Sequence, residues 1–145
     1  MTTITPQMVE RIPLEVLNNS NFGLINELVA SDFVDHSAQF GVAPTREGFK
    51  ESLIALKTAF PDLRYTIDDT IESGDRIVHR LTARGTMKAD YMGIQATNRQ
   101  ATWNEIHIAQ VVNGRLTEHW GIVDQLAMLV QLGVVEAPGR SPVAV

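Results

Sequence analysis

The sequence predicts a single α+β domain, a cone-shaped, curved antiparallel sheet with N-terminal helices packed over its concave face. Apolar residues recur at helical spacing as far as Phe60, whereas from Leu63 to Val123 the pattern alternates with a period of two. A short apolar helix then precedes Gly133. Helices that come before a strand meander pack on one face of the sheet, and a curved sheet covered in this way encloses a pocket.

Three helices are expected before Pro61. Thr5 can cap the first, and Pro13 marks a kink or break within it. A cluster of polar turn residues ends at Asn21, which can cap the second helix. Thr45 caps the third, which Pro61 stops. The apolar face of this third helix carries Phe49, Leu53, Leu56 and Phe60.

The strands follow Pro61, after a short extended segment at residues 33–36. Asn113-Gly114 is a strong hairpin signal because both residues tolerate positive φ. The predicted strands cover residues 63–71, 76–87, 99–112 and 115–123, with a loop at 90–98 and a last helix at 125–132. We expect residues 1–135 to form the domain and residues 136–145 to form a loosely ordered tail.

The composition describes a small acidic domain of 145 residues, with 44% hydrophobic residues, no cysteine and a net charge of −5. A chain of this length buries enough surface to fold without a disulfide or a metal. The absence of cysteine excludes thiol nucleophiles and thiolate metal sites, and the acidic balance disfavours nucleic acid. No targeting or membrane-spanning segment is visible, so we expect a soluble cytoplasmic protein without nucleic-acid or membrane partners.

Ionisable and aromatic side chains gather on the predicted hairpin around Asn113-Gly114. On its second strand, alternation places Trp120 and Asp124 on one face and His119 on the other, so His119 is expected outside the site unless a bulge intervenes. If Trp120 and Asp124 face the polar side of the first strand, the site has the aromatic walls and few ionisable groups of a small-molecule site. That side of the first strand carries Trp103, Glu105, His107 and Ala109.

Each of these residues also has a simpler structural explanation. Asp124 precedes the last helix, where aspartate is a favoured cap. His107 could be a half-buried core histidine paired with Glu105, and both tryptophans could simply fill the core. His79 lies between apolar residues and is expected to pack in the core, while His36 is expected on the surface.

Other chemistries find little support in the sequence. The glycine-rich nucleotide motifs, Gly-x-Ser-x-Gly and His-Glu-x-x-His are all missing. His36, His107 and His119 could bind a metal in principle, but they have no short paired spacing. We therefore expect neither a metal nor a cofactor.

The C-terminal part resembles the closing signature of the SnoaL-like polyketide cyclases, in the nuclear transport factor 2-like superfamily. The most specific match is Glu118-x-Trp120-x-x-x-Asp124 followed by Gln131-Leu132-Gly133. The chain departs from the family at Met87, where a histidine is common, and at Gln95, where a proline is common. Weaker matches, which extend the resemblance over residues 8–133, are Phe33-Val34-Asp35-His36, Phe60-Pro61-Asp62, Gly85-Thr86 and Gly93-Ile94-Gln95-Ala96-Thr97.

The resemblance implies an α+β cone and a cofactor-independent aldol cyclisation of a small, hydrophobic, polyketide-like substrate. The aspartate that matches Asp124 would be the catalytic acid and base, with His107 and His36 as the positional candidates for the histidines nearby. The family habit also implies a homo-oligomer, a dimer or tetramer, formed through the outer face of the sheet. The residues expected to bind the substrate are Trp120, Trp103, Glu105, Tyr91 and Phe60.

Two other functions fit the sequence at this stage. The same fold hosts epoxide hydrolases and isomerases, and an epoxide hydrolase would need Arg80 or Arg84 beside Asp124. Strand alternation puts both arginines on the face opposite Ile77, which counts against that function. The third possibility is a small-ligand-binding module without catalysis, in which Asp124 serves only as a cap.

Overall fold

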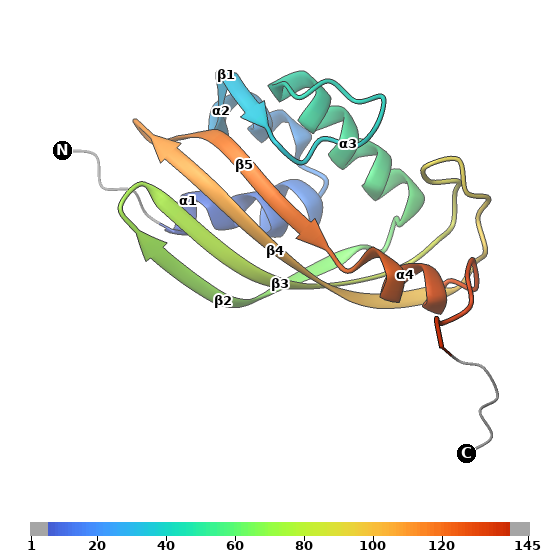
Figure 1. Cartoon of the computed structure of the whole chain (residues 1–145). Coiled ribbons are helices and arrows are strands. Elements are labelled where there is room, and N and C mark those ends of the chain that lie inside the picture. Colours follow the sequence, from blue (N-terminus) through green and yellow to red (C-terminus); the bar gives the residue numbers. More distant parts are fainter. Residues whose placement is uncertain (1–5, 140–145) are drawn as a thin grey trace.

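The N-terminal helical region changes its geometry at the positions where proline and turn residues occur. In the computed structural model, which describes residues 6–139 (Figure 1), α1 (Pro6–Arg11) continues into the π-helical turn η1 (Ile12–Leu17). Pro13 has no N–H to donate, so the predicted break is confirmed as a change of helix type. The expected cap Thr5 lies outside the described residues, as do residues 140–145 of the expected tail.

The second predicted helix is shorter than expected, because its last residue belongs to a strand. The segment consists of the 3₁₀ turn η2 (Phe22–Leu24) and α2 (Ile25–Leu28). Val29 is already extended and pairs with Leu116, so β1 (Val29–Asp35) begins there. The third helix, α3 (Arg46–Ala59), is confirmed together with its cap, since the Thr45 hydroxyl accepts the Gly48 N–H at 3.2 Å.

The sheet has five strands in the order β1-β5-β4-β3-β2 and is open at both edges. The four predicted strands form an antiparallel meander, but β1 pairs with β5 in parallel, so the sheet is mixed rather than purely antiparallel. In Figure 1 the helical layer lies on one side of the curved sheet. The remaining elements are β2 (Arg64–Ser73), β3 (Arg76–Thr86), β4 (Gln100–Val112), β5 (Arg115–Val123) and α4 (Gln125–Gln131).

A bulge in β5 decides which of its side chains face the helices. The Asn113-Gly114 turn pairs Val111 with Leu116, and an uninterrupted hairpin would then pair His107 with Trp120. The register instead shifts by one residue after Val111, and His107 pairs with Gly121. A one-residue shift turns every later side chain to the opposite face, so His119 faces the helices and Trp120 faces away from them.

The concave face of the sheet is buried under α1, η1 and α3. One apolar cluster joins Val9 and Val16 of the helices to Ile77 and Val111 of the sheet, and a second one surrounds Trp103. The outer face carries exposed isoleucines, and Ile122 is 77% exposed. Homo-oligomer formation through that face stays a prediction. Within residues 6–139, no helix is long and apolar enough to cross a membrane.

Candidate functional site

A cavity of about 170 Å³ lies between the concave face of the sheet and the helices that cover it. Most of its lining is apolar, from residues such as Ile12, Leu53 and Leu81. Its volume is close to that of an engineered protein cavity of about 150 Å³ that binds benzene. The cavity therefore has room for one six-membered ring. The ionisable side chains that line it are Asp35, Tyr65, His79, Tyr91, Glu105, His107 and His119.

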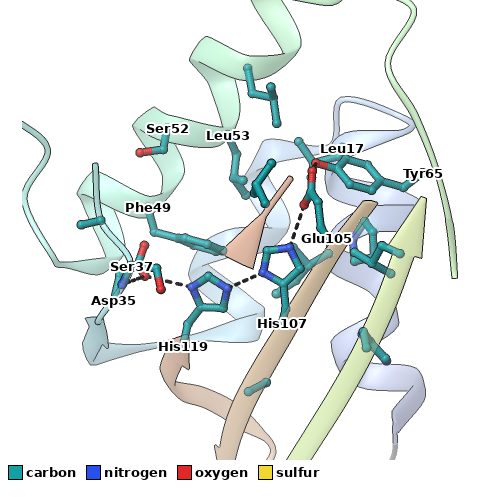
Figure 2. Close-up of a pocket in the computed structure, with 18 of the residues that line it drawn as sticks. Leu17, Asp35, Ser37, Phe49, Ser52, Leu53, Tyr65, Glu105, His107 and His119 are labelled. Carbon is teal, nitrogen blue, oxygen red and sulfur yellow. Dashed lines mark hydrogen bonds and ion pairs between the residues drawn. The ribbon is translucent and has the colours of Figure 1, made fainter. Parts of the chain in front are cut away.

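Four of these side chains form one unbroken hydrogen-bonded chain along the cavity wall (Figure 2). His119 Nδ1 lies 2.9 Å from Asp35 Oδ1, and His119 Nε2 lies 2.8 Å from His107 Nδ1. His107 Nε2 lies 2.7 Å from Glu105 Oε1. We refer to Asp35, His119, His107 and Glu105 as the proton chain, in which each imidazole uses both of its nitrogen atoms.

Strand register holds the proton chain together. Asp35 at the end of β1 lies beside His119 in the parallel pair, and His119 of β5 lies beside Ala109 of β4. His107 is the residue opposite Gly121. A Cβ atom at position 121 would come within 2.8 Å of His107 Cε1 and 3.0 Å of His119 Nε2. Glycine is therefore required here so that the two rings can meet.

The two ends of the proton chain are anchored by further donors. Glu105 Oε2 accepts the Tyr65 hydroxyl at 2.9 Å and Trp103 Nε1 at 2.7 Å. Burial and the neighbouring Glu105 raise the pKa of Tyr65 well above its usual value, so Tyr65 stays protonated as a donor. Burial disfavours the charge of Asp35 and by itself would raise its pKa. The pKa nevertheless lies below its usual value, because His119 contributes a hydrogen bond and a favourable charge and the Ser37 N–H donates a second hydrogen bond.

The proton chain has room for one proton more than two neutral imidazoles and two carboxylates supply. Its three contacts each need one hydrogen, but two neutral imidazoles bring only two and two carboxylates bring none. With only two hydrogens, one of the three contacts would place two lone pairs opposite each other. A third proton, on an imidazole or on a carboxylate, would fill all three contacts and give the four groups together a net charge of −1.

Three of the sequence-predicted site residues line the cavity: His107, Glu105 and Tyr91. Trp103 and Phe60 lie behind the wall, only 2% and 0% exposed, and their rings pack 5.4 Å apart. Trp103 contributes through its hydrogen bond to Glu105, whereas Phe60 contacts Tyr91 edge to face.

The remaining three lie away from the cavity. The expectation that Asp124 belongs to the pocket is wrong, because this side chain is exposed, lies outside the cavity lining and caps α4 by accepting the Ala127 N–H at 3.1 Å. Trp120 lies on the outer face because of the bulge, beneath the Arg76 guanidinium. His36 is exposed, as its simpler structural explanation predicted. Its ring stacks on Trp120 with ring centroids 4.7 Å apart.

Sequence reasoning missed His119 and Asp35. Strand alternation placed His119 on the outer face of the sheet, because the sequence of residues 115–118 gives no sign of the bulge. Gly121 was an available signal, since a glycine inside a strand often marks a bulge or a close approach of another group. Asp35 shares its strand face with the buried Phe33, which could have indicated a buried and therefore partnered carboxylate.

Two alternative chemistries can be compared with the geometry. Within residues 6–139, no arginine or lysine belongs to the cavity lining, and Arg80 and Arg84 are exposed as alternation predicted. The relay of an epoxide hydrolase therefore has no arginine here. Among residues 6–139, no group of three or more histidine, aspartate or glutamate side chains is arranged to hold a metal ion.

An open, curved sheet covered by helices, with a small and largely apolar cavity between them, defines the class of the domain, and the family follows from the sequence. The family model of the SnoaL-like polyketide cyclases matches residues 7–132, so the chain belongs to this family. A comparison with curated protein sequences found no match.

Solved structures support the same fold. IdmH from Streptomyces antibioticus, a proposed polyketide cyclase, is 32% identical with a TM-score of 0.76, covering 88% of this chain and 97% of its own. TsrD from Streptomyces laurentii is 23% identical with a TM-score of 0.81, over 92% of this chain and 100% of TsrD. AclR from Streptomyces galilaeus, a proposed hydroxylase, is 22% identical with a TM-score of 0.79, over 92% and 83% of the two chains.

Proposed function

We propose that the protein catalyses a cofactor-independent intramolecular aldol cyclisation of a small polyketide-like carbonyl compound. The observation that carries this proposal is the proton chain on the wall of a largely apolar cavity. The family resemblance assigns the acid and base role to Asp124, but this residue is exposed and outside the cavity lining. We therefore assign the role to Glu105, which lines the cavity and is 5% exposed.

The reaction needs a proton to leave carbon and a proton to reach oxygen. Glu105 takes the proton from a carbon beside one carbonyl, and the resulting enolate carbon attacks a second carbonyl of the same molecule. A carbon–carbon bond forms, the carbonyl π bond breaks, and the new alkoxide receives the proton that Glu105 carries. Product and substrate are isomers, so the step consumes no oxidant or reductant.

The imidazole pair supplies charge stabilisation. The enolate is anionic, and we place the third proton on the imidazole pair, so that His107 and His119 share one positive charge next to Glu105. Fixed charges in a site that excludes water stabilise such an intermediate more strongly than water does. Asp35 holds His119 in position by its hydrogen bond and partly balances the charge.

Tyr91 provides a second donor to the substrate. Its oxygen accepts Gln39 Nε2 at 3.3 Å, which leaves the hydroxyl proton available for a substrate carbonyl in the cavity. Burial raises the pKa of Tyr91, the hydrogen bond from Gln39 lowers it, and the charge of Glu105 raises it. The net effect is a raised pKa, so the hydroxyl stays protonated at neutral pH.

The test uses heptane-2,6-dione, a linear diketone that closes to a six-membered ring by this reaction alone. NMR spectroscopy follows the cyclic ketol with and without protein. We expect the wild type to accelerate ring closure and Glu105→Gln to lose about 100-fold or more of that rate, the usual range for a general acid–base group.

Glu118→Gln is the matched control, because Glu118 pairs with His36 on the outer face at 2.8 Å and does not line the cavity. This variant should retain the wild-type rate. The proposal is wrong if Glu105→Gln closes the ring as fast as the wild type. It is also wrong if the wild type binds the diketone without accelerating its closure, which would favour a ligand-binding module.

A further inference from the structure

His79 is a cavity residue that the proposed chemistry leaves unused. It lies on β3 directly opposite His107 of β4, on the same concave face. Side chains in such a pair start about 5 Å apart. His79 is only 3% exposed, yet its Nε2 atom has no hydrogen-bond partner in the part of the chain that the structure describes. The sequence predicted a packed core residue, and its burial confirms that, but packing does not account for a polar atom without a partner.

An unpaired buried nitrogen is unfavourable, and most buried polar atoms in proteins do have partners. The neighbours of His79 along β3 on this face, Ile77 and Leu81, offer no hydrogen bond. His107 cannot help either, because both of its nitrogens are already engaged in the proton chain. Among residues 6–139 this atom therefore lacks a protein partner, and the His79 residue that carries it lines a cavity that fits one ring.

We infer that His79 is a specificity-determining residue that hydrogen-bonds a second oxygen of the bound molecule. The part of the ligand inside the cavity is then an uncharged, ring-sized segment with one oxygen toward the Tyr91 hydroxyl and another toward His79. This inference rests on the proposed function only in treating the cavity as the substrate site.

The chemistry of a neutral imidazole suits a carbonyl compound. Burial and the nearby His107 lower the pKa of His79, with Glu10 opposing them, so the ring is neutral at neutral pH. A neutral imidazole has one N–H donor and one nitrogen acceptor. It can donate to a ketone oxygen or accept from an enol hydroxyl, which are the two forms that a dicarbonyl substrate takes. A cationic or anionic group at the same place would fit only one of them.

Two probes that differ by a single oxygen test the inference: cyclohexanone and cyclohexane, titrated into the protein and followed by NMR spectroscopy. We expect His79→Leu to weaken cyclohexanone binding by about tenfold, which corresponds to one hydrogen bond, and to leave cyclohexane binding unchanged. His79→Gln retains a group that can donate or accept and should keep the cyclohexanone affinity within about threefold.

Stability gives a second readout. His79→Leu removes the unpaired atom, so its melting temperature should rise by about 3 °C. Thr97→Val is the matched control, since Thr97 Oγ1 is the other buried atom without a partner in the described residues and does not line the cavity. It should gain a similar amount without changing either affinity.

The inference is overturned if His79→Leu binds cyclohexanone as tightly as the wild type, or if the wild type binds neither probe. If His79→Leu is too unstable to measure, a tenfold loss of cyclohexanone affinity in His79→Gln also overturns it. Binding of the probes is measured without turnover, so the two proposals can fail separately. If His79→Leu weakens cyclohexanone binding but the wild type never closes heptane-2,6-dione, the proposed function is refuted and the inference on His79 stands.

Discussion

Gly121→Ala separates the two imidazoles of the proton chain without altering any ionisable group. The new methyl would lie 2.8 Å from His107 Cε1, whereas ordinary contact begins at 3.4 Å. The His107 ring must therefore withdraw by about 0.6 Å or more, and the 2.8 Å contact between His107 and His119 lengthens toward the limit of a hydrogen bond. The pair then loses the geometry in which a hydrogen bond can join the two rings.

The energetic cost has two parts. Overpacking a well-filled site costs about 1–3 kcal/mol, and a hydrogen bond to a charged group is worth about 1.5–3 kcal/mol. We expect a loss of about 3 kcal/mol in the free energy of unfolding, or about 9 °C in melting temperature. A displacement on this scale in an active site should also slow ring closure of heptane-2,6-dione by about 100-fold.

The assays are thermal unfolding and the diketone rate. Gly23→Ala is the matched control, because a Cβ there meets nothing within 4 Å and the position is exposed. It should be neutral or slightly stabilising, since alanine restricts the unfolded chain. If Gly121→Ala unfolds and turns over like Gly23→Ala, the two rings do not depend on this glycine and the reasoning is refuted.

Two further predictions concern the carboxylates. The pKa of Asp35 is lower in the folded than in the unfolded protein. The carboxylate therefore stabilises the fold fully above its unfolded pKa of about 3.9, and this stabilisation is lost as the pH falls through the folded pKa. Urea unfolding between about pH 6 and pH 3 should therefore show a steeper acid loss for the wild type than for Asp35→Asn, and parallel curves would contradict this. Asp124→Ala should lose about 1 kcal/mol of stability with the α4 cap, while Asp124→Asn keeps the cap. Both should retain the diketone rate, and a loss of rate in Asp124→Asn at unchanged stability would return the catalytic role to Asp124.

Much of the fold could be predicted because it depends on local patterns. Helical spacing and the Thr45 cap placed α3, and alternation with the Asn113-Gly114 turn placed β4 and β5. The parallel edge strand β1 was not predictable in this way, because its partner β5 lies far along the chain and no turn connects them.

The residues of the candidate site were predictable only where alternation within a single strand determines which face a side chain occupies. Glu105 and His107 share a face of β4 by alternation alone, so their place on the cavity wall followed from the sequence. His119 required the register between two strands, and the bulge reversed that register. Asp124 shows the opposite case, in which a position within a family signature serves a local structural role as the cap of α4.

The most direct test of the central claim is to locate the hydrogens of the proton chain by neutron diffraction from deuterium-exchanged crystals near neutral pH. The account predicts a deuterium in each of the three contacts, including one between His107 Nδ1 and His119 Nε2. An empty contact between the two imidazoles, with each ring singly protonated, would contradict it.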